Sequence, residues 1–262
     1  MPESVDLMVL ATAYVDEHIG EFHNKRISAI SDLSLSVLLK KKNPYLFKAK
    51  NLEIASDFVR TLLDAHLSSQ EETMFGQWLE KLAIYVSKLV DGGQRPATTD
   101  VDLDFTREGV RYLVSVKSGP NWGNSSQKRD LKEAFKNARR QLQLDPNIHM
   151  TFIEGCCYGR QINEDQGTHL KKCGQAFWQF ITKDPEFYRE IIVPIGHIAR
   201  EKNVEFASEY ARVLNTFTHE FLEAYCAADG AVDWNALLAF NSSSSPLPRS
   251  PSRRSGGQQT SR

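Results

Sequence analysis

Residues 101–117 contain two short segments in which apolar and polar residues alternate, and this feature most constrains the fold. VDLDF (101–105) and RYLVSVK (111–117) each have a period of two, and Arg107-Glu108-Gly109 between them has the composition of a turn. The pattern predicts a hairpin of two short strands. A hairpin of this size is not stable alone, so its apolar face has to pack against other elements.

The segments on both sides of the hairpin have a helical pattern. In residues 3–91 apolar residues recur at spacings of three and four, and Asn43-Pro44 interrupts them. We expect two helices at 51–68 and 70–90, ended by Asp91-Gly92-Gly93. A helix over 127–144, a mostly buried third strand over 147–159 and helices from about residue 174 to 240 follow. This order predicts an α/β fold, in which a small mixed sheet is covered by helices from both ends of the chain.

The domain organisation follows from the same pattern. We expect one domain over residues 1–240, made of a helical region (1–91), a central core (97–182) and C-terminal helices (185–240). Residues 241–262 are rich in Ser, Pro and Arg and are expected to form a disordered tail, because they cannot bury enough apolar area to fold.

The composition is that of a globular protein, with 41% hydrophobic and 25% charged residues. The chain has no apolar run of the length that crosses a membrane, and its first residues lack the basic region of a signal peptide, so we expect a cytoplasmic protein with reduced cysteines. Its net charge is −1, and the four arginines of residues 241–262 leave −5 for residues 1–240. A nucleic-acid-binding surface of the folded part would therefore be a local basic patch.

Asp102 and Lys117 are the hairpin side chains that suggest chemistry. If the apolar faces of both strands look into the core, alternation places Asp102 beside Ser115 and Lys117. A carboxylate can hold Mg²⁺, and a lysine can orient or deprotonate a water and offset charge on a phosphate. The alternative is a solvated surface of an exposed hairpin, and a register shifted by two would put Asp104 in the place of Asp102.

The loop and the helix that follow Lys117 favour the functional interpretation. SGPNWGNSS (118–126) is rich in small residues, as a strand end requires where another backbone comes close. The helix beyond it suits a phosphate backbone, although a solvated surface helix is the alternative. Its two acids, Asp130 and Glu133, are outnumbered by six basic residues, Lys128, Arg129, Lys132, Lys136, Arg139 and Arg140.

These residues also carry a family resemblance. The hairpin resembles the active-site hairpin of the PD-(D/E)xK nuclease superfamily. The longer segment YLVSVKSGPNWGNSSQ (112–127), with NPYLFKAK (43–50) and GCCYG (155–159), is similar to a group of type II restriction endonucleases. The likeness covers about residues 43–238. It implies a restriction-endonuclease-like α/β/α core that cuts both strands of double-stranded DNA at a short site with Mg²⁺, commonly as a homodimer, and with a DNA methyltransferase as genetic partner.

Carried over residue by residue, the motif makes Asp102 its first acid and Lys117 its lysine. The sequence departs from the superfamily at Ser115, where Asp or Glu is usual, and at Val101, where proline is usual. Some relatives with a serine at this place take the missing carboxylate from the following helix. The resemblance therefore leaves three candidate donors, which are Glu133, then Asp130, and Glu80 on the helix before the hairpin.

The resemblance implies further roles in the same region. The backbone carbonyl of Val116 is an expected metal ligand. Gln127 resembles the glutamine that some members place after the lysine to touch phosphate or water. The expected DNA contacts are Asn121, Asn124, Lys128, Arg129 and Lys132.

Other features have simpler interpretations. Cys156, Cys157 and a helical His169-x₃-Cys173 pair fit a zinc pattern, but adjacent cysteines of a strand point to opposite faces, so we expect core thiols. The aromatic stripe at 177–181 is expected to be core.

Two other functions stay open: a structure-specific or repair nuclease, and a degenerate nuclease fold that binds DNA through the basic helix, as Ser115 suggests.

Overall fold

The computed structural model describes residues 6–96, 101–142, 149–160 and 164–244. The chain divides into two compact units, one within residues 1–31 and 68–209 and the other within 32–67 and 210–262. Helices α4 (Ala55–Asp91) and α9 (Ala199–Tyr225) contribute residues to both units. That residues 1–240 form one folding domain stays a prediction.

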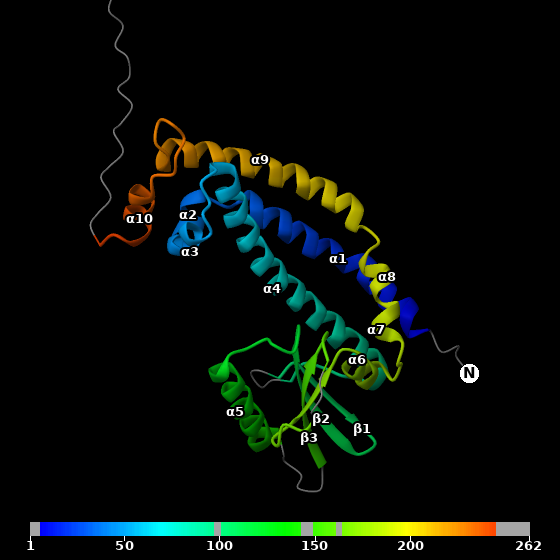
Figure 1. The fold of residues 1–262 in the computed structure, drawn as a ribbon. Coiled ribbons are helices and arrows are strands. Elements are labelled where there is room, and N and C mark those ends of the chain that lie inside the picture. Colours follow the sequence, from blue (N-terminus) through cyan, green and yellow to red (C-terminus); the bar gives the residue numbers. More distant parts are fainter. Residues whose placement is uncertain (1–5, 97–100, 143–148, 161–163, 245–262) are drawn as a thin grey trace, which may run out of the picture. The chain divides into compact units, whose positions relative to one another are not determined.

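The first unit is built on a four-stranded mixed sheet of order β1-β2-β3-β4 (Figure 1). β1 (Leu103–Arg107) is antiparallel to β2 (Val110–Lys117), while β3 (His149–Cys156) and β4 (Leu170–Cys173) continue the sheet in parallel. Glu108 and Gly109 have φ of 52° and 76°, which is the conformation of a tight two-residue hairpin turn. The predicted hairpin is confirmed, with its first strand two residues later than expected, and β4 was not predicted.

One face of the sheet packs against α4 and α6 (Gln175–Thr182), and α1 (Leu7–Ser31) joins the same core cluster from the far side of α4 (Figure 1). The contact joins Leu103, Phe105 and Val114 of the hairpin to buried side chains of these helices. The aromatic stripe of α6 is part of it, since Phe177, Trp178 and Ile181 are at most 3% exposed. The prediction that the stripe is core is confirmed.

The other face is covered by α5 (Ser125–Leu142), which completes an α/β/α arrangement (Figure 1). Leu131 and Phe135 of α5 pack on Leu113 of β2 in a second core cluster, and each such burial contributes about 1.5–3 kcal/mol. The alternation of the hairpin is confirmed for Leu103, Phe105 and Val114, and the face opposite to these residues is buried as well. Leu113 is fully buried under α5, and Val101 lies in the same cluster because regular pleating of β1 begins only at Leu103.

The helices before and after the sheet are interrupted at other positions than we expected. The two helices expected at 51–68 and 70–90 are one helix, α4, because Ser68-Ser69-Gln70 contains no glycine or proline to end it. Its predicted end is confirmed: Gly92 has φ 69° and donates its N–H to the Lys88 carbonyl at 3.1 Å. The C-terminal helical region expected over 185–240 begins with two short helices, α7 (Phe187–Glu190) and α8 (Ile192–Ile195), which are followed by α9.

The second unit is helical. It contains α2 (Leu35–Lys41), α3 (Pro44–Ala49), α10 (Trp234–Ser242) and parts of α4 and α9. Its core includes Phe58, whose ring centroid lies 4.9 Å from that of Phe47 and 4.6 Å from that of Phe221. α10 extends two residues into the predicted tail, and the tail from residue 245 on lies outside the described residues. Across the described segments, every helix is too short or too polar to cross a membrane.

Candidate active site

Asp102 lies directly before β1 and is bound to β2 through backbone and side chain. Its N–H donates to the Val114 carbonyl at 2.8 Å. Its Oδ2 accepts hydrogen bonds from the Val116 N–H at 2.7 Å and from the Ser115 hydroxyl at 3.4 Å. Asp102 and Ser115 are therefore neighbours, as the sequence register predicts, and Oδ1 is the carboxylate oxygen that these bonds leave for other partners.

Lys117 ends β2 at the point where the chain leaves the sheet. Its carbonyl accepts the Cys157 N–H at 2.9 Å, and its Nζ lies 4.7 Å from the centroid of the Trp122 ring. A hollow of about 260 Å³ opens beside it, lined by Lys117, Trp122, Gln127, Asp130 and Leu131. The lysine thus lies at the mouth of a small cavity between the end of β2 and the start of α5.

Glu80 of α4 and Arg95, which follows that helix, join the same site. Gln94 exchanges backbone hydrogen bonds of 3.1 and 2.8 Å with Asp104 of β1, which brings the next residue, Arg95, to Asp102. The Arg95 guanidinium forms an ion pair with Glu80, and its Nη2 lies 3.7 Å from Asp102 Oδ1. One cationic group therefore links two carboxylates that come from different elements.

The electrostatics agree with this grouping. Burial raises the pKa of Glu80 and the negative charge of Asp102 raises it further, whereas the charges of Arg95 and Lys117 lower it. Glu80, Asp102, Lys117 and Arg95 thus act on one another within a single site. Two nearby carboxylates suit Mg²⁺, which is usually held by one or two carboxylates together with waters and substrate phosphates. Among the described residues, no group of three or more His, Cys, Asp or Glu is placed to hold a metal ion.

The other candidate acids differ in position. Asp130 lines the hollow beside Lys117. Glu133 is fully exposed and forms an ion pair with Lys136 at 2.7 Å, which lowers its pKa. Asp104 binds Arg111 through two hydrogen bonds of 2.9 and 2.6 Å, so it anchors the hairpin and does not replace Asp102. The structure therefore brings Glu80 and Asp130 close to the predicted pair, and Glu133 less so.

The predicted DNA contacts lie on the loop and on the first turns of α5. Asn121, Asn124, Lys128, Arg129 and Lys132 are all exposed. Asn124 and Gln127 also bond each other reciprocally, since each side-chain oxygen accepts the other's backbone N–H at 3.0 Å. This is a capping box, and it satisfies the start of the helix. Gln127 is thus a capping residue that also lines the hollow.

The small residues after Lys117 allow another part of the chain to come close. At Gly119 the neighbour is a side chain, whereas the sequence led us to expect a backbone. A Cβ on Gly119 would lie 2.3 Å from the ring of Tyr158. Any side chain at this position would displace that ring, so the glycine lets the loop pack on the residues after β3.

Sequence reasoning missed Glu154, which is the β3 neighbour of Ser115. Its side chain is 7% exposed and accepts hydrogen bonds from Trp122 Nε1 at 2.9 Å and Lys171 Nζ at 2.7 Å, and it pairs with His169 Nε2 at 3.1 Å. Burial alone would raise the pKa of Glu154, but the bonds from His169, Lys171 and Trp122 outweigh it and lower the pKa to about 2. A lone acid inside the apolar run MTFIEGCC was the available signal, because a buried charge needs partners.

The cysteines are core residues, as expected. Cys157 lies in the first core cluster, and Cys156 faces Cys173 across β3 and β4. Burial raises the pKa of all three thiols. His169 and Cys173 do not share a helical face, because Cys173 lies on strand β4 and His169 directly before it.

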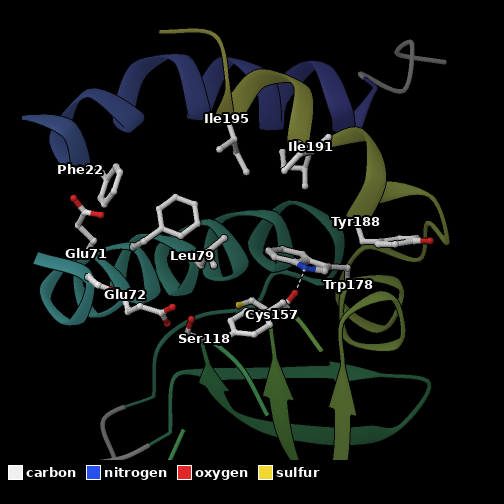
Figure 2. A pocket seen from close by; sticks show the side chains of 14 residues that line it. Phe22, Glu71, Glu72, Leu79, Ser118, Cys157, Trp178, Tyr188, Ile191 and Ile195 are labelled. Atoms are coloured by element: carbon white, nitrogen blue, oxygen red, sulfur yellow. Dashed lines mark hydrogen bonds between the residues drawn. The ribbon is translucent and has the colours of Figure 1, made fainter. Parts of the chain in front are cut away.

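The first unit also has a larger cavity, at a different place. It has a volume of about 560 Å³ and is lined mainly by apolar side chains such as Phe22, Leu79, Trp178 and Ile191 (Figure 2). Trp178 is held there by a hydrogen bond to the Cys157 carbonyl at 2.8 Å. Asp102 and Lys117 are not among its lining residues, so this cavity is not the candidate active site.

A small mixed sheet between helices, with acids and a lysine gathered at its end, is the architecture of a restriction-endonuclease-like α/β nuclease. The family model of the type II restriction endonuclease EcoO109I matches residues 10–203. Since this match covers more than half of the chain, the protein belongs to that family. It is therefore a type II restriction endonuclease, a site-specific deoxyribonuclease that binds DNA. A comparison with curated proteins finds no match.

Proposed function

We propose that the protein hydrolyses phosphodiester bonds in both strands of double-stranded DNA at a specific short site, with Mg²⁺ as cofactor. The proposed site is a variant PD-(D/E)xK centre made of Asp102, Glu80 and Lys117. One observation supports it above the others: the carboxylates of Glu80 and Asp102 converge on a single cationic group, the Arg95 guanidinium. Two acids that share one cation in this way fit a divalent ion.

Each residue has a stated role in this proposal. Asp102 Oδ1 and Glu80 hold the ion, with the Val116 carbonyl as a further ligand. When bound, the ion stabilises charge on the phosphate and lowers the pKa of a coordinated water. Lys117 orients the attacking water and offsets the phosphate charge. Ser115 supports Asp102 through its hydroxyl and supplies no ligand.

The DNA-binding surface is proposed to include Asn121, Asn124, Lys128, Arg129 and Lys132. These exposed residues surround the start of α5, where Lys117 and Gln127 line the hollow. The positive charges of Lys128, Arg129 and Lys132 suit a phosphate backbone. A homodimer matches the two-fold symmetry of a short DNA site, and a cognate DNA methyltransferase would protect the host. Sedimentation with and without DNA tests the dimer.

Plasmid digestion tests the catalytic assignment. In Mg²⁺ the wild-type protein should give discrete fragments, and Asp102→Ala and Lys117→Ala should each abolish cutting while DNA binding in Ca²⁺ persists. Glu80→Gln should lose cutting as well. The matched control is Glu133→Gln, whose carboxylate is exposed and paired with Lys136, and it should cut as the wild type does. Undiminished cutting by Asp102→Ala and Lys117→Ala would refute the proposal.

A further inference from the structure

We propose that Trp122 is a positioning residue for Lys117, and that a buried ionic network around Glu154 holds Trp122 in place. The inference rests on the proposed role of Lys117 in cleavage. It concerns residues that lie beside the proposed metal site and belong to the loop and the two strands next to it.

The first contact is between the ammonium of Lys117 and the indole face of Trp122. The Nζ lies 4.7 Å from the ring centroid, which is within the range of a cation–π interaction. Lysine has a flexible four-carbon stem, so its ammonium has no fixed position of its own. The indole face restricts it to one side of the hollow that both residues line.

The second contact fixes the ring itself. Trp122 Nε1 donates a hydrogen bond of 2.9 Å to Glu154 Oε1, so the indole edge is bound to β3 while its face meets Lys117. Lys171 of β4 binds the same oxygen at 2.7 Å and the Pro120 carbonyl at 2.9 Å. The loop after Lys117 is thus tied to the sheet at two points, Pro120 and Trp122.

Buried charged groups destabilise a fold unless each of them is paired. Glu154, His169 and Lys171 are each at most 8% exposed, and the carboxylate of Glu154 binds Trp122, His169 and Lys171. Removing one partner would leave a charge buried without compensation. Because its oxygens are committed to these donors, Glu154 is not a metal ligand, although it is the strand neighbour of Ser115. It acts on the site through Trp122.

The deciding experiment compares Trp122→Leu with Trp122→Phe under single-turnover conditions. Trp122→Leu removes both the aromatic face and the N–H, and its cleavage rate should fall at least about tenfold. Trp122→Phe keeps an aromatic face and should recover the rate to within about threefold. DNA affinity in Ca²⁺ should stay within about twofold for both, since the proposed effect is on the reacting lysine and not on binding.

Two further variants make the test specific. Glu154→Gln keeps an acceptor for the indole N–H but loses its charge, so its rate should lie between those of the wild type and Trp122→Phe. Tyr158→Leu is the matched control, because it removes an exposed aromatic ring that packs at Gly119 on the same loop, and it should cleave at the wild-type rate. Should Trp122→Leu be unfolded at the assay temperature, Trp122→Met replaces it.

Several outcomes would overturn the inference. These are a wild-type rate for Trp122→Leu, equally slow Leu and Phe variants, or parallel losses of rate and DNA affinity. Failure of this inference is distinguishable from failure of the proposed function. If Lys117→Ala is inactive while Trp122→Leu is fully active, only the positioning role is wrong; if Lys117→Ala cleaves normally, the proposed function itself is wrong.

Discussion

Arg95 provides the sharpest test of the proposed metal site, because its guanidinium lies where a cation between Glu80 and Asp102 would lie. A divalent ion bound by these carboxylates has to displace it. Replacing Arg95 with glutamine removes this competitor and keeps a side chain of similar length. We therefore expect Arg95→Gln to bind the metal more tightly than the wild type, although it removes a positive charge from a site that binds phosphate.

The size of the effect follows from the geometry. Two unit charges 3.7 Å apart, as Nη2 of Arg95 and Oδ1 of Asp102 are, interact by about 1 kcal/mol when water screens them. Arg95 is 58% exposed and Glu80 is 26% exposed, so the range for surface pairs, about 0.2–1 kcal/mol, applies to both contacts. The gain in metal affinity should therefore be about two- to fivefold at low salt, and it should shrink as salt screens the pair.

Calorimetric titration of Ca²⁺ and Mg²⁺ into metal-free protein measures this effect. Lys81→Gln is the matched control, because Lys81 is the next residue of α4 after Glu80 and pairs with Glu21 at 3.4 Å, away from Asp102. It removes the same charge and should leave the metal affinity unchanged. Equal or weaker metal binding by Arg95→Gln than by the wild type would refute the idea that Glu80 and Asp102 hold the ion.

Three further predictions concern the neighbouring residues. Ser115→Ala should reduce cleavage by no more than about threefold, because Asp102 keeps its 2.7 Å bond to the Val116 N–H; a loss as large as that of Asp102→Ala would make the hydroxyl essential. Replacing Arg139 and Arg140, which line a basic groove on α5, with glutamine should weaken binding to all DNA sequences alike and reduce the salt dependence, as measured by fluorescence anisotropy. The stability from ionised Glu154 is present above its ordinary pKa of 4.5 and is lost as pH falls through its folded value of about 2. Urea unfolding should therefore show the advantage of wild type over Glu154→Gln falling by about 3 kcal/mol between about pH 5 and about pH 2, and a constant difference would contradict the pairing.

The hairpin could be predicted from the sequence because its determinants are local. The period of two, the turn at Glu108-Gly109 and the alternation around Asp102 fix which residues of the two strands meet. The outcome is the predicted neighbourhood of Asp102 and Ser115. The burial of the second face could not be predicted in the same way, because the burial of Leu113 depends on α5 folding back over the sheet.

Strand β4, which could not be predicted from the sequence, depends on residues that are distant in the chain. β4 has four residues, two of them lysines, so it lacks the length and the alternation that predict a strand. It forms because β3 offers a parallel edge, and Glu154 pairs with Lys171 across that edge. No local pattern sets such a register, and for this reason the network under Trp122 could not be read from the sequence.

The same pairing gives a physical reason for the serine at position 115. Ser115 is fully buried, with Asp102 on one side and Glu154 as its neighbour on β3. An acid at position 115 would form a row of three carboxylates across three strands, and adjacent like charges destabilise a sheet. A serine keeps the hydrogen bond to Asp102 without adding a charge.

This reasoning predicts that positions 115 and 154 are coupled. Ser115→Asp should destabilise the fold by about 1–3 kcal/mol, from overpacking and like-charge repulsion, and the added cost should be smaller in a Glu154→Gln background. Urea unfolding of the two single variants and the double variant gives the coupling energy, for which we expect about 0.5–1 kcal/mol in favour of the double variant. Strict additivity would mean that the two side chains do not sense each other. In that case the serine has no electrostatic explanation, and the carboxylate that the superfamily places there could be restored without regard to Glu154.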